Sequence, residues 1–215
     1  MTSKPQQLKI ISGFIFVFIC SGALSLNAQG VFFNGHLQSA DLHSGMNVYE
    51  IALAPQITFR SQSGRGFGFN GHFMMPISSE IAGNFSMGTG IVPFLFDGHL
   101  QYNILPDYPE HIAFGIGGGI HYLREDKWNH VTPYLYPTIS KTLDWGGFVV
   151  TPYVLIPLGL TFYRDKVQFP LKATLGTRMT NKDLKNVFFF LEGGFGILNA
   201  PIQVAFGLSF QFESG

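Results

Sequence analysis

The sequence has few charged residues. Asp, Glu, Lys and Arg make up 12% of its 215 residues, whereas an average soluble domain has about 25%. The formal net charge is zero and no run of basic residues occurs, which argues against binding to nucleic acid. Aromatic residues, in contrast, reach 15%, with 23 Phe, and there are 26 Gly. A chain of this composition would cover a water-facing surface poorly, although its length suffices for one domain of ordinary size.

The N-terminal segment has the order of features that is typical of a secretory signal peptide. Lys4 and Lys9 precede the apolar run IISGFIFVFIC, and small and polar residues follow it. We expect residues 1–28 to be removed by cleavage after Ala28, with cleavage after Ala23 as the alternative.

Cysteine is nearly absent, since the only one, Cys20, falls within this leader. The mature chain, residues 29–215, would therefore contain no disulfide, no cysteine-based metal site and no thiol nucleophile. A retained membrane anchor and lipidation at Cys20 are the alternatives. Against the first, the apolar run is shorter than the ~20 residues that span a bilayer. Against the second, Ile19 is bulky where lipidation requires a small residue.

After the leader, no segment approaches 18 uninterrupted apolar residues, so a helical membrane span is not expected. Polar and apolar residues instead alternate with a period of two, which predicts extended strands. In LFDGHLQYNIL, for example, Asp97 and His99 alternate with Phe96 and Leu100. Nine such runs cover residues 47–59, 64–75, 95–105, 112–122, 130–140, 148–162, 167–179, 186–198 and 201–212.

The two faces of these predicted strands differ in size as well as polarity. One face carries mostly Gly, Ala, Thr, Ser, Gln and Asn, and the other carries large apolar residues without any charge. A small barrel is filled by side chains at about eight strands, so the large face would overfill its interior and must point outward into lipid. Strands in lipid must form a closed barrel. We therefore predict an all-β fold, a transmembrane antiparallel up-and-down β-barrel.

The number of strands is predicted to be ten, with eight as the alternative. A barrel whose two termini lie on one side needs an even number, and VFFNGHLQ, residues 31–38, is the natural tenth run. The longest connection, residues 77–90, would then be extracellular. Pro55 and Pro157 lie centrally in their runs and are expected to cause local bulges.

Taken together, the leader, the alternating runs and a Phe-rich terminal strand, AFGLSFQF, resemble those of a small bacterial outer-membrane β-barrel protein with a porin-like architecture. The resemblance covers residues 30–212. It implies a location in the outer membrane of a Gram-negative cell envelope, with membrane lipid as a partner. It also implies that the barrel-assembly machinery recognises the terminal strand, although here Glu213, Ser214 and Gly215 follow Phe212.

The polar face holds the candidate functional residues. If residues 106–110 form a turn, Asp97 lies opposite position 119 and diagonal to His121. Lys172 and Glu192 are likewise predicted to lie diagonally across a turn at 181–185 and to form an internal ion pair. The predicted polar network of the lumen comprises Glu50, Asp97, His99, His121, Lys172, Arg178 and Glu192.

These residues predict a barrel that is structural or forms a narrow channel for small solutes. The alternatives are a lipid-modifying enzyme, such as a lipid A deacylase or palmitoyl transferase, and a surface adhesin or receptor. We expect no enzyme, because the histidines show no catalytic cluster, and we expect no cofactor and no metal. The glycines of GIGGGI are expected to make room for neighbouring side chains. Four aromatic residues near run ends are expected to lie at the membrane interface: Tyr102, Trp128, Trp145 and Tyr163.

Overall fold

The protein is described by a computed structural model that covers residues 48–60, 65–90, 92–108, 111–125, 128–164, 166–184 and 186–213. The predicted signal peptide and the predicted strand at 31–38 lie outside these residues. No helix long and apolar enough to cross a membrane occurs in the described part of the chain.

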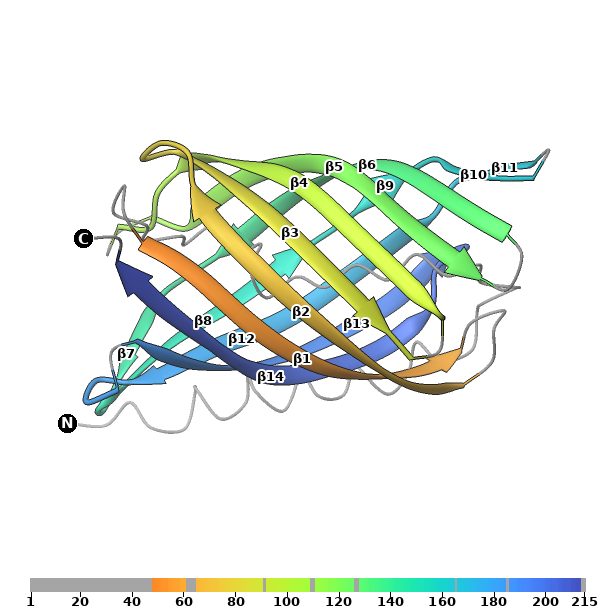
Figure 1. The fold of residues 1–215 in the computed structure, drawn as a ribbon. Helices are drawn as coiled ribbons and strands as arrows, with labels where there is room; N and C mark the ends of the chain where they lie inside the picture. Colours follow the sequence, from red (N-terminus) through yellow and green to blue (C-terminus); the bar gives the residue numbers. More distant parts are fainter. Residues whose placement is uncertain are drawn as a thin grey trace.

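The described residues form fourteen β-strands that wrap into one antiparallel barrel with tilted strands (Figure 1). The strands are β1 (Val48–Arg60), β2 (Gly66–Pro76), β3 (Ile81–Thr89), β4 (Phe94–Leu105), β5 (Ala113–Glu125), β6 (Trp128–Ser140), β7 (Leu143–Trp145), β8 (Phe148–Leu155), β9 (Leu158–Gly159), β10 (Thr161–Tyr163), β11 (Lys166–Gln168), β12 (Leu171–Asn181), β13 (Val187–Leu198) and β14 (Ile202–Glu213).

The ring closes because its first strand pairs with its last. Strands β1 to β6 pair in order, β6 pairs with β8, β8 with β12, and β12, β13 and β14 lead back to β1. Strand β1 begins and strand β14 ends at the same end of the barrel, which we call the terminal end, and the opposite end is the far end. The predicted fold class and the count of ten strands are thus confirmed.

Four short strands, β7, β9, β10 and β11, are not separate members of this ring. The pair Ser140–Tyr153 joins β6 to β8, and the pair Leu135–Leu158 joins β6 to β9 in the same register. Strands β8, β9 and β10 therefore follow one line, β7 extends β6, and β11 precedes β12 on the same line.

The tenth wall strand differs from the predicted location in the chain. Residues 77–90 do not form a long extracellular connection, because they contain β3, which pairs with β2 on one side and β4 on the other. The alternation in this segment is weak because an outward position is occupied by Gly83, beside which Met75 and Ile77 pack. Only Ile81, Phe85 and Met87 mark its apolar face.

The large apolar side chains point out of the barrel, as predicted. Ala52 and Leu53 are neighbours in β1, yet Ala52 is fully buried and Leu53 is 45% exposed. Every wall strand contributes outward residues of this kind: Ile51, Phe69, Phe85, Leu100, Ile120, Leu135, Phe148, Met179, Phe189 and Phe210. An outer surface of this composition is suited to hydrocarbon rather than water.

A charge on this outer surface should therefore be costly. We expect Leu53→Arg, near the middle of β1, to lower the free energy of unfolding by roughly 2–4 kcal/mol, the cost of Arg at the bilayer midplane. Phe212→Arg, close to the terminal end, should cost only about 0–1 kcal/mol. Urea unfolding in phospholipid vesicles measures both values, and equal costs at the two positions would contradict a lipid-facing wall.

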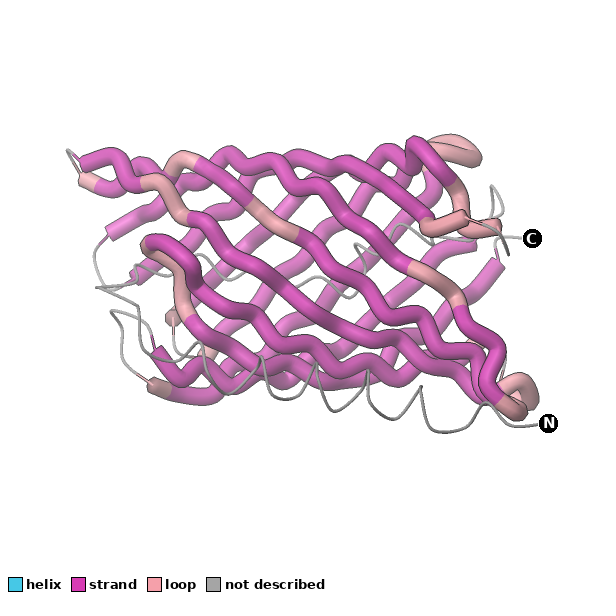
Figure 2. Tube along the Cα trace, turned by 180° about the vertical axis from the view of Figure 1, so that it is seen from behind, coloured by secondary structure: helices cyan, strands magenta, loops and turns pink. Residues whose placement is uncertain are grey.

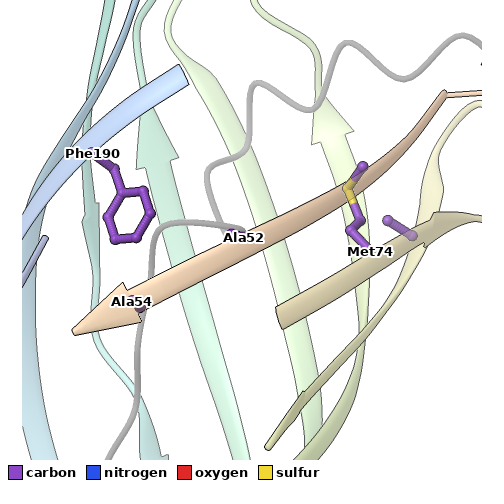
Figure 3. Packing of buried hydrophobic residues seen from close by; sticks show 5 residues of the cluster. Ala52, Ala54, Met74 and Phe190 are labelled. Carbon is purple, nitrogen blue, oxygen red and sulfur yellow. The ribbon is translucent and has the colours of Figure 1, made fainter. Parts of the chain in front are cut away.

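The interior contains small apolar patches between its polar groups. In Figure 3, Phe190 from β13 points toward the lumen side of β1, where Ala52 and Ala54 lie, and Met74 of β2 is next to them. These residues, with Ala82, form one buried cluster. A second cluster consists of Tyr134, Tyr136, Tyr153 and Leu155.

Pro55 and Pro157 do not shift the register of the strands in which they lie. In β1, Leu53 pairs with Leu208 and Gln56 with Ala205, so the register with β14 is the same on both sides of Pro55. The same holds around Pro157, which separates β8 from β9. The expectation of bulges at these two prolines was therefore wrong: each leaves a gap in the ladder, because proline has no N–H to donate.

Candidate functional site

The structure places all seven residues of the predicted polar network inside the barrel. Glu50, Asp97, His99, His121, Lys172, Arg178 and Glu192 are each at most 8% exposed. They come from five different wall strands, because the period of two directs every second side chain of each strand inward.

Asp97 lies at the centre of one group of lumen side chains. Its carboxylate shares a 2.7 Å hydrogen bond with His99 Nδ1 and accepts the single hydrogen of the Tyr134 hydroxyl, which lies 2.9 Å from Oδ1 and 2.8 Å from Oδ2. The imidazole of His99 also meets the Tyr136 ring edge-on, with centroids 5.6 Å apart. The position and orientation of His99 are thus fixed from two sides.

The register around Asp97 differs from the prediction by two residues. Asp97 lies directly opposite His121, and position 119 lies opposite His99. The connection between β4 and β5 extends to residue 112 rather than 110, and the pairing shifts near Asn103, so the strands slide relative to the predicted turn. A slide of two residues leaves every side chain on its predicted face.

Direct register partners extend this arrangement into a row across the inner wall. His72 is opposite Ser86, Ser86 opposite Asp97, Asp97 opposite His121, and His121 opposite Thr132. Polar side chains from β2 to β6 therefore form one continuous row along the inner wall.

A second group of polar residues lies toward the terminal end. Arg178 Nη2 of β12 donates a 2.6 Å hydrogen bond to Glu50 Oε2 of β1, and Gln211 Nε2 of β14 donates another of 3.0 Å. The Arg178 guanidinium also lies 3.8 Å from the centre of the Phe188 ring. Because β13 and β14 separate β12 from β1 in the wall, the Arg178–Glu50 ion pair crosses the lumen.

Lys172 and Glu192 are not diagonal neighbours as predicted. The register places Glu192 opposite Gly176, whereas Lys172 is opposite Gly196. Glu192 Oε2 accepts a 2.9 Å hydrogen bond from the Tyr153 hydroxyl. The Lys172 ammonium lies within electrostatic range of both Glu192 and His121.

Glycines in the wall make room for the largest lumen side chains, as predicted for GIGGGI. A Cβ atom at Gly117 would lie 2.1 Å from Tyr136 Cζ, and one at Gly176 would lie 2.2 Å from Tyr153 Cζ. A Cβ at Gly194 would lie 2.2 Å from Lys172 Cε. Each glycine thus lets a long side chain lie flat against the inner wall.

Several lumen residues were not among the predicted site residues. Tyr134, Tyr136 and Tyr153 hold Asp97, Gln101 and Glu192, respectively, by their hydroxyl groups. The sequence contained a signal for them, since all three fall on the polar side of their runs. Their large size made an inward position hard to predict, because large aromatic rings also suit an outward position.

Some buried polar atoms of the lumen have no protein partner among the described residues. They include both amide atoms of Asn84, His99 Nε2, Glu50 Oε1 and the hydroxyls of Thr58, Thr138, Ser140 and Thr174. Asn84 is directly opposite His99, so their unpartnered atoms share one part of the lumen. No group of three or more His, Cys, Asp or Glu side chains in the described ranges is placed to hold a metal ion.

At the terminal end, an ion pair outside the spanning strands joins the connection between β4 and β5 to the residues that follow β6. Lys141 Nζ lies 2.8 Å from Asp107 Oδ1 and also donates hydrogen bonds to the carbonyl groups of Tyr108 and His111. The other carboxylate oxygen of Asp107 accepts a hydrogen bond from the Thr142 amide. Partial burial alone would raise the pKa of Asp107, but the bonds from Lys141 and Thr142 outweigh it and lower the pKa below its ordinary value.

This lowered pKa predicts a contribution to stability that depends on pH. The ionised form of Asp107 is favoured by folding, so its contribution is present above its ordinary pKa of about 3.9 and is lost as pH falls through the lowered value. We expect Asp107→Asn to cost at most about 1 kcal/mol at pH 7, since solvent screens a pair at the rim. Unfolding measured between pH 7 and pH 2 should show this difference disappear in acid, and a difference that grows in acid would contradict the assignment.

The four aromatic residues predicted at the interface lie near strand ends. Trp145 is at the terminal end and Trp128 and Tyr163 are at the far end, while Tyr102 faces outward near the end of β4. At the far end, the Arg164 guanidinium lies 3.7 Å from the centre of the Trp128 ring. The Tyr163 ring stacks on His130 with centroids 4.1 Å apart.

No model of a known protein family matches the sequence, and no curated protein matches it. Among solved structures, the COG4313 outer membrane channel from Pseudomonas putida F1 is similar over 85% of this chain and 100% of that chain, with a TM-score of 0.53 and 7% identity. The β domain of the Bordetella autotransporter BrkA matches 78% of this chain and 100% of that chain, with a TM-score of 0.46 and 11% identity. At such identities the likeness concerns the fold alone. The chain has the fold of an outer-membrane β-barrel.

Proposed function

We propose that this protein is a narrow channel of the bacterial outer membrane, through which small polar solutes pass along a hydrated lumen. The observation that carries the proposal is the set of buried polar atoms without partners among the described residues, such as those of Asn84 and His99. A buried polar group without a partner is costly, and in native proteins water usually satisfies it. A lumen in which the polar residues merely satisfied one another would leave few such atoms.

The Arg178–Glu50 ion pair would act as the constriction of this channel. It crosses the lumen and its two charges are almost fully buried. Gln211 donates a further hydrogen bond to Glu50, and the Phe188 ring lies against the Arg178 guanidinium. Rings of charged side chains select among ions in other channels. The proposal includes no catalytic role, no cofactor and no metal.

The proposal also places the two ends of the barrel. The terminal end would face the periplasm, as in barrels whose two termini lie on one side. The outward apolar residues would contact membrane lipid, and β14 would be the strand that the barrel-assembly machinery recognises.

Conductance in planar lipid bilayers tests the proposal. We expect small unitary currents from the refolded wild-type protein and larger ones from the variant Glu50→Ala/Arg178→Ala, because both side chains that cross the lumen are then shortened. Leu53→Ala, on the lipid-facing side, serves as the control and should conduct like the wild type. Absence of current from all three proteins, despite verified insertion, would overturn the proposal and leave a structural role.

A further inference from the structure

Five of the prolines in the barrel wall lie on three adjacent lines of strand. Pro133 and Pro137 are in β6, Pro152 and Pro157 lie on the line from β8 to β10, and Pro170 precedes β12. We call this region the proline seam. Figure 2 shows short loop segments that interrupt the long strands of the wall. On the lines that carry these prolines, the strands are interrupted at residues 156–157, 160 and 169–170.

Each proline of the seam leaves the ladder with one hydrogen bond where two are usual. The Ile156 amide donates to the Pro137 carbonyl at 3.2 Å and the Leu160 amide to the Pro133 carbonyl at 3.0 Å, but neither proline can donate in return. Lys141 and Pro152 are related in the same way. The contact between β6 and the line from β8 to β10 thus lacks backbone bonds at three positions.

The line from β8 to β10 also lacks backbone hydrogen bonds on its other side, toward β12 and the segment that precedes it. The Lys172 amide donates to the Pro157 carbonyl, and the Gly159 amide donates to the Pro170 carbonyl, each at 3.2 Å. Again the proline cannot donate in return. The line from β8 to β10 is therefore bonded more sparsely to both neighbours than an uninterrupted strand would be, in a wall where lipid cannot supply the missing bonds.

Two apolar grooves in the outer surface flank this seam. One, of about 470 Å³, is lined by outward residues that include Leu100, Ile116, Leu135 and Pro137. The other, of about 320 Å³, is lined by residues that include Ile139, Pro152, Val154 and Leu175. Both open on the side that faces hydrocarbon, so acyl chains of the bilayer are what cover them.

The floor of each groove reaches the lumen. Gly117 and Tyr136 line the first groove, and Gly176 and Tyr153 line the second, although both tyrosines point inward and are nearly fully buried. In each case the tyrosine ring lies flat over the glycine. On the lumen side these rings belong to one apolar cluster with Tyr134 and Leu155. A glycine and one ring therefore separate hydrocarbon from the lumen.

We propose that the barrel wall parts at the proline seam and admits the acyl chain of a bilayer lipid between β6 and β8, against the cluster of Tyr136, Tyr153 and Leu155. The sparse backbone bonding lowers the cost of separating β6 from β8, and the two grooves bring acyl chains to the outer surface on both sides of this contact. The rings of Tyr136 and Tyr153 supply the apolar contact for the chain on the lumen side. This inference goes beyond the proposed channel and does not depend on conduction.

Quenching of a lumen tryptophan by brominated lipid tests the proposal. Tyr153→Trp, with Trp128→Phe and Trp145→Phe as background, places one fluorophore behind the seam. Met74→Trp in the same background places one in the lumen behind β2, away from the seam. In phosphatidylcholine vesicles with brominated acyl chains, we expect markedly stronger quenching of the first variant, because only its wall admits a chain. Equal quenching of the two variants would overturn the proposal.

A disulfide across the seam supplies the second arm of the test. Leu135 and Leu158 are direct partners across the seam, and Leu135→Cys/Leu158→Cys should suppress the extra quenching when oxidised and restore it when reduced. Ile51→Cys/Phe210→Cys joins β1 to β14 in the same manner and should have no effect. Quenching that persists through the oxidised seam disulfide would also overturn the proposal.

A measurement on the wild-type barrel covers the case in which these variants do not fold. Amide hydrogen exchange should be faster at Ile156, Leu158 and Leu160 than at Ile51 and Leu53 of β1, because opening of the seam exposes the first set. Exchange at the seam as slow as in β1 would contradict the opening.

Discussion

Replacement of Arg178 with methionine is expected to lower the free energy of unfolding of the barrel by about 3–5 kcal/mol. The reason is that the substitution leaves the buried Glu50 carboxylate without its positively charged partner. Glu50 is fully buried, and without the guanidinium Gln211 is the one described residue that would remain to donate a hydrogen bond to its Oε2 atom. An uncompensated buried charge is far more costly than the loss of an exposed pair. Urea unfolding in lipid vesicles, followed by tryptophan fluorescence, measures the change.

A second variant also removes the negative charge of Glu50. Glu50→Gln/Arg178→Met should recover most of the stability lost in Arg178→Met, because no charge is then left in the lumen at this level. The matched control is the pair Lys182–Asp144, whose 2.6 Å separation equals that of Arg178 and Glu50 but which lies exposed at the rim. Lys182→Met should cost less than about 1 kcal/mol. Additive effects of the two lumen substitutions would show that they do not interact.

The second large loss of stability is expected when alanine replaces Gly119, which adds a single methyl group. Gly119→Ala should destabilise the barrel by about 3 kcal/mol or more, or prevent folding, because overpacking a site that cannot relax carries such a cost. The new Cβ would lie 2.2 Å from the Gly98 carbonyl oxygen and 2.6 Å from His99 Cα. Both are backbone atoms of β4, so relief requires β4 and β5 to separate where His99 and Asp97 are held.

Another glycine of the wall provides the control for this substitution. Gly71 points outward from β2, and a Cβ there would meet no atom within 4 Å. Gly71→Ala should therefore be neutral or should gain up to roughly 1 kcal/mol from the reduced freedom of the unfolded chain. Heat or urea unfolding of the two variants side by side measures the contrast. If Gly119→Ala were as stable as Gly71→Ala, the close contact of β4 and β5 would be incorrect.

The period of two was sufficient to predict which side of each strand faces inward. It works because a lipid-facing wall admits large apolar residues and excludes charges, whereas the lumen accepts small and polar ones. Asp97 and Lys172 could thus be assigned to the lumen from their neighbours alone. The same criterion missed β3, where Gly83 occupies an outward position and its place is filled by Met75 and Ile77 from elsewhere in the chain.

The alternation of polar and apolar residues cannot determine the register in which neighbouring strands pair. A slide of two residues preserves every inward and outward assignment, so the pattern favours positions 97 and 119 as partners no less than 97 and 121. The observed choice of His121 depends on the length of the connection and on the shift near Asn103. Gly119, with its place against His99, follows from that choice as well.

The sequence by itself determined an all-β barrel, its inside and its outside, and the residues that line the lumen, because these properties follow from the local alternation of side chains along each strand. Only the tertiary structure decided that Arg178 reaches Glu50 across the lumen, and that five prolines from three separate runs come together in one seam. The reason is that contacts across the lumen and between neighbouring strands depend on how the ring of strands closes. Closure brings together residues that are far apart in the sequence, and no local pattern of side chains specifies which residues these are.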